Sequence, residues 1–151
     1  MSFVDPHIYK IREFRSMTPA DFEKLQKITE TKITFEKHSL LGKLTEIPVL
    51  YQTYLRILMK EQKELNDLKN KLEVLYGQLY QTYKFESTYR WETKNEIESQ
   101  INSDPTYNTV KASYQEQEVV VNYLSITLDN IKSMSFQIRA YIDYEKFLNG
   151  D

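Results

Sequence analysis

The chain has 151 residues, a net charge of −2 and 28% charged residues, values that neither indicate nor exclude a nucleic-acid binder. The absence of cysteine excludes disulfides and thiolate metal sites, and only 3 Gly and 4 Pro favour long regular elements over a loop-rich sandwich. No apolar run approaches the roughly 20 residues that a membrane span needs, and the N-terminus lacks the apolar core of a signal peptide. The composition therefore predicts one soluble intracellular domain, with or without an arm.

The first 32 residues are expected to form an arm followed by a short helix. The segment "TPADFEKLQKITE" opens like a helix: Thr18 is a natural N-cap, Pro19 suits the first helical position and Asp21 follows three residues after the cap. The β-branched segment "TKITF" is expected to end this helix. We therefore predict an N-terminal arm and short helix over residues 1–32 and a helical domain over residues 33–151.

A heptad repeat dominates the next part of the chain. Pro48 suits the first turn of a new helix, and no further proline occurs before Pro105. Apolar residues recur at alternating steps of four and three, with a polar residue at Glu61. These apolar positions are Ile47, Tyr51, Tyr54, Leu58, Leu65, Leu68, Leu72, Leu75 and Leu79. The pattern predicts one helix from Pro48 to about Lys84, with an end or a kink in Phe85–Tyr89.

A short polar helix is expected in "WETKNEIESQINSD", and a new helix at Asp104, which can cap it, and Pro105, which can occupy its first position. The second heptad run that follows has polar residues at two positions. Its positions are Val110, Tyr114, Gln117, Val121, Leu124, Leu128, Ile131, Ser135, Ile138 and Ile142. Two such helices predict an all-α fold with an antiparallel helical hairpin. Because a hairpin alone buries too little apolar surface, we expect a homo-oligomer, either a ring or a bundle.

The sequence carries no pattern of an enzyme. His7 and His38 are the only histidines, too few for a credible Ser–His–Asp grouping, and no H-E-x-x-H motif or glycine-rich phosphate loop is present. The carboxylates lie on predicted helix faces among lysines, at spacings typical of i,i+4 ion pairs rather than of acid–base pairs. We expect no catalytic activity and no metal site.

Two segments resemble motifs of a known family. In "LKNKLEVLYG", Lys69 and Lys71 take the places of a Lys and an Arg in a short basic motif that runs into aromatics and a glycine. The tail "LDNIKSMSFQIRAYIDYEKFLNG" matches a C-terminal segment of the form Leu-x-x-Ile-x-x-x-x-Phe-x-Ile with a Phe-containing end. The chain resembles the UvsY-type recombination mediators of T4-like bacteriophages over roughly residues 33–150. It departs from them at Lys71, which lacks the forked donor of Arg, and at Ser135, where the family has Gly.

The resemblance implies a function and a set of partners. Members of this family bind single-stranded DNA as ring-like homo-oligomers, help to displace the phage single-strand-binding protein and stabilise filaments of a RecA-type recombinase. The resemblance thus implies a recombination mediator without catalytic activity or cofactor, acting in the cytoplasm of an infected bacterial host.

The candidate DNA-binding residues lie in the first long helix and at the hairpin corner. Lys69 and Lys71 flank the seam on opposite sides, where they can contact phosphates or simply pair with Glu64 or Glu73. Around the corner, cations alternate with Tyr80, Tyr83, Phe85, Tyr89 and Trp91, a pattern that suits stacking on unpaired bases but also a corner packed by its own rings. The candidate residues are Lys60, Lys63, Lys69, Lys71, Lys84, Arg90 and Lys94.

The tail is the candidate oligomerisation segment. Its apolar residues can form a seam between subunits, the core of the chain's own hairpin, or both. Lys132, Arg139 and Lys146 recur every seven residues beside this seam, as a row for DNA or a partner or as an ordinary solvated face. The candidate oligomerisation residues are Leu128, Ile131, Phe136, Ile138, Ile142 and Phe147.

A second function stays open at this point. Near-neutral charge and plain heptads are also typical of a coiled-coil structural or scaffolding protein with no nucleic-acid role.

Overall fold

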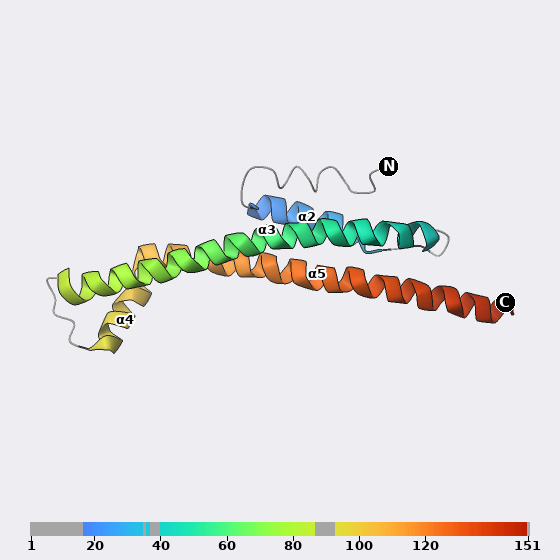
Figure 1. The fold of residues 1–151 in the computed structure, drawn as a ribbon. Coiled ribbons are helices and arrows are strands. Elements are labelled where there is room, and N and C mark those ends of the chain that lie inside the picture. The colour runs from blue at the N-terminus through green and yellow to red at the C-terminus, as the bar shows by residue number, and fades with distance from the viewer. Residues whose placement is uncertain (1–16, 35, 37–39, 87–92, 151) are drawn as a thin grey trace. The chain divides into compact units, whose positions relative to one another are not determined.

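The described elements of the fold are helices (Figure 1). A computed structural model describes residues 17–34, 36, 40–86 and 93–150. It contains α2 (Pro19–Lys32), α3 (Leu40–Gln81), the π-helical turn η2 (Thr82–Glu86), α4 (Lys94–Ser103) and α5 (Pro105–Asn149). These described ranges contain no strand, which confirms the all-α prediction, and none of their helices is apolar enough over sufficient length to cross a membrane.

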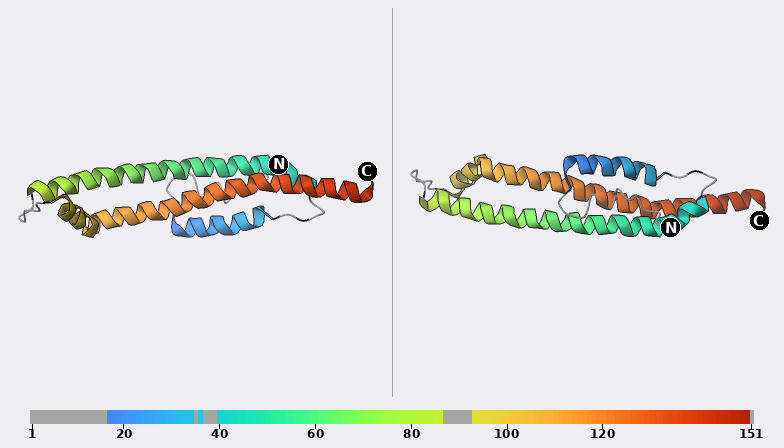
Figure 2. Two further views of the ribbon diagram at one scale, coloured as in Figure 1. Left: turned by 90° about the horizontal axis from the view of Figure 1, so that it is seen from below. Right: turned by 90° about the horizontal axis from the view of Figure 1, so that it is seen from above.

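The chain divides into two units, each containing a stretch of α3 and a stretch of α5 that run in opposite directions (Figure 2). Unit 1 contains α2, α3 up to Glu61 and α5 from Val120 onward. Unit 2 is Gln62–Val119 and contains the rest of α3 and α5 together with η2 and α4. The predicted antiparallel pairing of the two long helices is therefore confirmed.

The short helix α2 begins as its sequence predicts. The Thr18 side chain accepts a hydrogen bond of 3.2 Å from the backbone N–H of Asp21, and the Asp21 carboxylate accepts one of 3.2 Å from the backbone N–H of Thr18. This capping box satisfies amide groups that the first turn would otherwise leave unpaired. The helix ends at Lys32 inside the β-branched segment, as expected. The beginning of the arm, residues 1–16, lies outside the described residues.

The first long helix is longer than predicted, because α3 begins at Leu40 and not at Pro48, and it ends at Gln81. Pro48 lies inside the helix, where it has no amide hydrogen to donate to the carbonyl of Leu44, a disruption of about 3 kcal/mol. Leu40 and Ile47 are buried in the core of unit 1. Since burying one such side chain contributes about 1.5–3 kcal/mol, these contacts offset the proline and extend the helix by two turns.

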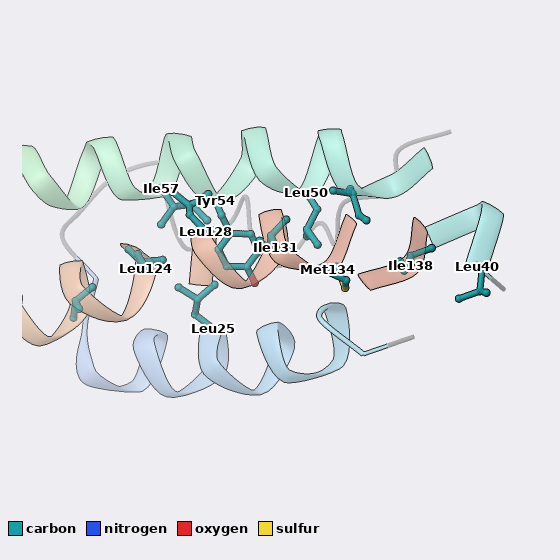
Figure 3. Packing of buried hydrophobic residues seen from close by; sticks show 12 residues of the cluster. Leu25, Leu40, Leu50, Tyr54, Ile57, Leu124, Leu128, Ile131, Met134 and Ile138 are labelled. Atoms are coloured by element: carbon teal, nitrogen blue, oxygen red, sulfur yellow. The ribbon is translucent and has the colours of Figure 1, made fainter. Parts of the chain in front are cut away.

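The core of unit 1 lies where α2, α3 and α5 meet (Figure 3). Leu25 of α2 is buried among side chains of both long helices, and the Phe22 ring meets the Tyr123 ring edge-on at 5.3 Å. The buried apolar residues of this core are Leu25, Leu40, Ile47, Leu50, Tyr54, Ile57, Val120, Leu124, Leu128, Ile131, Met134 and Ile138. A third helix therefore contributes to what sequence periodicity described as a hairpin.

The third helix also changes which heptad positions are buried. Of the predicted α5 seam, Val121 and Ile142 are only half-buried, whereas Val120 and Met134, one position away from seam residues, are buried. Tyr123 faces Phe22 of α2, so apolar contacts on α5 extend over a face wider than a two-helix seam requires.

Unit 2 is packed more lightly. The predicted short helix α4 is present, with a capping box between Thr93 and Glu96, and it buries Ile97 and Ile101. The α3 leucines of the predicted seam in this unit are half-buried, and they are Leu65, Leu68, Leu72, Leu75 and Leu79. The prediction of a heptad helix is confirmed here, while full burial of its seam is not reached.

Candidate nucleic-acid interface

The α3 lysines of unit 2 are exposed. Within the described part of the chain, Lys63, Lys69 and Lys71 form no ion pair, so the pairing of Lys69 or Lys71 with Glu64 or Glu73 is absent there. Because each residue of an α-helix advances by about 100°, Lys69 and Lys71 point to opposite flanks of the helix. Three ammonium groups are thus available to phosphates, but they do not share one face.

Lys60 differs from these lysines. It belongs to the α3 stretch of unit 1, is half-buried and has interactions within the chain. A DNA contact by Lys60 would therefore have to replace an existing contact, whereas Lys63 and the motif lysines need no such exchange.

Two further candidates, Lys84 and Lys94, are connected through a network at the corner of unit 2. The Lys94 ammonium lies 3.7 Å from the Glu98 carboxylate, which accepts a hydrogen bond of 3.3 Å from the Tyr76 hydroxyl. The Tyr76 ring stacks on the Tyr80 ring with 6.5 Å between centroids, and the Lys84 ammonium lies 5.8 Å from the centre of Tyr80. The structure thus brings together two predicted cations that lie ten residues apart in the sequence.

A second pair of contacts fixes the turn η2 to the start of α5. The Tyr83 hydroxyl donates a hydrogen bond of 2.9 Å to Asp104, whose other carboxylate oxygen accepts one of 3.0 Å from the Tyr107 backbone N–H. Asp104 is therefore the predicted helix cap and also the acceptor for a tyrosine 21 residues upstream. The Tyr107 ring in turn lies 6.1 Å from the Tyr76 ring, nearly edge-on.

The titration of these groups follows from their contacts. The backbone hydrogen bond from Tyr107 lowers the pKa of the Asp104 carboxyl below its ordinary value. The hydrogen bond to Asp104 raises the pKa of Tyr83, and burial followed by the Glu98 carboxylate raises the pKa of Tyr76. At neutral pH Asp104 is an anionic acceptor and both tyrosines are protonated donors.

The predicted rings at the corner divide into half-buried tyrosines and one exposed phenylalanine. Tyr76, Tyr80 and Tyr83 are half-buried and held by other side chains of unit 2, as expected for a corner packed by its own rings. Phe85 on η2 is 68% exposed and has the Lys84 ammonium 5.2 Å from its ring centre. Arg90, Tyr89 and Trp91 lie outside the described residues, as do His7 and His38.

Sequence reasoning did not single out Tyr107 or Glu98. Both act through contacts with α3 residues more than 20 positions away, Tyr107 through its ring and Glu98 through its carboxylate. Periodicity carries no signal for such pairs. These contacts depend on how α4 and α5 are aligned with α3 inside unit 2.

The candidate oligomerisation residues also separate into two groups. Leu128, Ile131 and Ile138 are buried by the chain's own helices in unit 1, and Ile142 is half-buried against the same core. Phe136 and Phe147 are exposed, Phe147 at 79%. Other large apolar residues on the same stretch of α5 are exposed too, namely Ile126, Tyr144 and Leu148.

The described residues contain no group of three or more His, Asp or Glu side chains placed to hold a metal ion.

A sequence model of a family described as "Recombination, repair and ssDNA binding protein UvsY" matches residues 28–151. Among curated proteins, none matches the chain significantly. Crystal structures of the bacteriophage T4 recombination mediator protein UvsY have a similar fold. Lattice type II gives a TM-score of 0.77 at 20% identity and covers 89% of this chain and 99% of that chain. Lattice type IV gives 0.75 at 22% identity, with 83% and 96% covered. The likeness to these structures shows the fold, and because the family match spans most of the sequence, the chain belongs to the UvsY family.

Proposed function

We propose that the protein is a recombination mediator that binds single-stranded DNA as a homo-oligomer. In this role it promotes loading of a RecA-type recombinase onto DNA covered by a phage single-strand-binding protein, in the cytoplasm of an infected bacterial host. The observation that carries the proposal is the match of residues 28–151 to a family of recombination, repair and ssDNA-binding proteins. The protein needs no cofactor for this role.

Phosphate contact is assigned to the exposed lysines of unit 2. Lys63, Lys69 and Lys71 are exposed and without ion pairs among the described residues, so binding a phosphate breaks no existing salt bridge. Residues 51–84 carry six Lys and Arg against four Asp and Glu, whereas the whole chain has a net charge of −2. A small local excess of charge becomes effective when several subunits present it along one strand, because linked weak sites raise the overall affinity.

Self-association is assigned to the outer stripe of α5 in unit 1, which we define as Ile126, Phe136, Ala140, Tyr144, Phe147 and Leu148. Ile126, Ala140 and Phe147 lie at multiples of seven residues, so they drift by only about 20° per heptad. Residues two positions apart on a helix point about 200° apart, so Ile126 and Ala140 face away from the buried Leu124 and Ile138. α5 thus has a second seam directed outward, and a second copy of this chain carries a matching one.

This assignment revises the predicted oligomer contacts. Phe136 and Phe147 remain candidates, while Leu128, Ile131 and Ile138 already serve the chain's own core. Lys132, Arg139 and Lys146 are exposed beside the outer stripe, where they are suited to the polar rim of a subunit interface.

Titration of fluorescent single-stranded DNA at low and then raised salt, with light scattering on the same sample, tests both halves of the proposal. We expect a several-fold oligomer whose affinity falls as salt rises, because phosphate neutralisation releases counterions. Loading is then tested by following recombinase ATP hydrolysis on DNA coated with single-strand-binding protein, which the protein should accelerate. Salt-independent binding would contradict the phosphate contacts.

The outer stripe has its own test. Ile126→Asp combined with Phe147→Asp places charges on the stripe and should lower the mass measured by light scattering. Gln52→Asp, on an exposed position of α3 in unit 1, adds a charge outside the stripe and should leave the mass unchanged. Equal masses for all three proteins would assign assembly to another surface.

The second candidate function is a coiled-coil scaffold without a nucleic-acid role. The observation that favours it is that Lys69 and Lys71 lie on opposite flanks of α3 and do not form one basic face. An oligomer that ignores DNA even at low salt would establish this alternative.

A further inference from the structure

The rings at the corner of unit 2 differ in how they are held. Tyr76 is fixed by its hydrogen bond to Glu98 and by two neighbouring rings, and Tyr83 is fixed by its hydrogen bond to Asp104. These contacts join α3 and η2 to α4 and α5 inside unit 2. Tyr76 and Tyr83 are therefore held in place before any ligand binds.

Phe85 is the exception among the described rings of the corner. It lies on the π-helical turn η2, a rare conformation that is frequent at functional sites. Its ring is 68% exposed, although exposing a large aromatic side chain to water is unfavourable. Within the described residues its ring interacts with the ammonium of Lys84, 5.2 Å from the ring centre.

The position of Lys84 makes the exposed ring more than an apolar patch. The same ammonium lies 5.8 Å from the Tyr80 centre, so two rings attract it and hold it over the exposed Phe85 ring. A nucleotide has the matching pair of groups, because its phosphate is an anion and its base is a flat ring a short distance away. A phosphate drawn to Lys84 brings an unpaired base within reach of Phe85.

We propose that Phe85, with Lys84 beside it and Tyr80 behind the ammonium, is a stacking site for an unpaired nucleobase. The inference rests on the proposed function and adds to it the source of selectivity for single strands. Lysines on α3 attract the phosphates of single-stranded and duplex DNA alike, whereas the face of a base is open only in a single strand. Phe85 therefore supplies the discrimination that the lysines cannot.

The test compares variants of the full chain by titration with a single-stranded oligonucleotide containing 2-aminopurine and with a duplex of the same sequence. Phe85→Ala removes the ring, and Phe85→Trp keeps an aromatic face. Val119→Ala is the matched control, because Val119 is another exposed apolar residue of unit 2. Light scattering on each sample reports the oligomeric mass.

We expect Phe85→Ala to weaken binding of the single strand by on the order of ten-fold and to remove the stacking-dependent quenching of 2-aminopurine. Binding of the duplex and the dependence on salt should stay unchanged, because a neutral ring neutralises no phosphate. Phe85→Trp should restore affinity and quenching, and Val119→Ala should resemble the parent protein.

Two results would overturn the stacking site. In the first, Phe85→Ala still prefers single strands and still quenches 2-aminopurine as the parent does. If its binding remains dependent on salt, the proposed lysine contacts are unaffected by this result. In the second, Phe85→Ala lowers the oligomeric mass, which makes Phe85 a subunit contact. A parent protein that binds no single-stranded DNA at low salt would remove the proposed function itself, and the stacking site with it.

Discussion

Unit 1 and unit 2 are made from stretches of the same two helices, yet their interiors differ. In unit 1 several seam residues of α3 and α5, among them Tyr54 and Ile131, are buried together with Leu25 of α2. In unit 2 the described apolar side chains that reach full burial are Ile97 and Ile101, both on α4. The heptad pattern is similar in both, so the difference comes from the third helix that each unit adds. α2 buries side chains against both long helices, whereas α4 has only 10 residues.

Under the proposed function, this difference fits separate roles for the two units. A well-packed interior resists local opening, and a lightly packed one leaves polar and aromatic groups at the surface, where ligands bind. Unit 1 is thus suited to stability and assembly, and unit 2 to contact with DNA.

The largest expected effect is on the free energy of unfolding, when a core side chain is shortened in each unit. Ile131→Ala removes a fully buried side chain of unit 1 and should lower the free energy of unfolding by about 2–5 kcal/mol. Leu72→Ala shortens a half-buried side chain of unit 2 and should cost about 1 kcal/mol. Urea unfolding followed by circular dichroism, at one protein concentration, measures both. Equal losses would contradict the distinction between the units.

A buried polar contact in unit 1 gives the next effect. The Thr29 hydroxyl donates to the Leu25 carbonyl at 2.7 Å, so the Tyr54 hydroxyl is the donor in their shared hydrogen bond. Thr29→Val keeps the shape but removes the hydrogen bond between these two buried hydroxyls, at a cost of about 1 kcal/mol. Thr31→Val on the exposed face of α2 is the control, and urea unfolding should show little change for it.

The two capping boxes allow the contributions of α2 in unit 1 and α4 in unit 2 to be compared directly. Thr18→Ala and Thr93→Ala each remove an N-cap, which costs about 1 kcal/mol. Because α2 is part of the core of unit 1, we expect Thr18→Ala to lower global stability. Thr93→Ala should mainly speed amide hydrogen exchange within α4. If Thr93→Ala lowered global stability and Thr18→Ala did not, α4 would contribute more to the stability of the fold than its few buried residues indicate.

The smallest effect concerns pH and Asp104. Its folded pKa lies below the ordinary value of 3.8, so the unfolded chain binds protons more readily as the pH falls. The stability that Asp104 contributes is fully present above about pH 5 and is lost as the pH falls through the folded pKa. Asp104→Asn still caps α5 but does not titrate, so its unfolding free energy should change less between pH 7 and pH 3 than that of the parent. An Asp104→Asn protein with the same pH dependence as the parent would contradict this contribution of Asp104.

The sequence predicted the elements better than their contacts. Local signals such as the Thr18 cap, the Asp104–Pro105 start and the heptads placed α2, α4 and α5 correctly. The early start of α3 was missed because Pro48 carries a strong local signal, while the burial of Leu40 and Ile47 that outweighs it is a tertiary effect. The division into residues 1–32 and residues 33–151 stays a prediction.

The candidate sites show the same limit. Periodicity identified exposed lysines and a corner rich in rings, but could not tell which apolar residues of α5 face inward. The heptad run placed Val121 and Ser135 on the seam, and the structure half-buries both and buries their neighbours Val120 and Met134 instead. That outcome depends on the position of α3 and α2 beside α5. No pattern within α5 encodes it.

The most direct test of the account compares two pairs of cations in one assay. Lys69→Ala with Lys71→Ala changes unit 2, and Lys24→Ala with Lys27→Ala changes exposed cations of α2 in unit 1. Single-stranded DNA is titrated over a range of salt, with light scattering for mass. We predict that the unit 2 variant stays oligomeric, binds DNA more weakly, and has a salt slope reduced by about 0.7 for each phosphate that it no longer neutralises, while the unit 1 variant binds DNA like the parent. Unchanged binding by the unit 2 variant, or equal weakening in both, would contradict the assignment of DNA contact to unit 2.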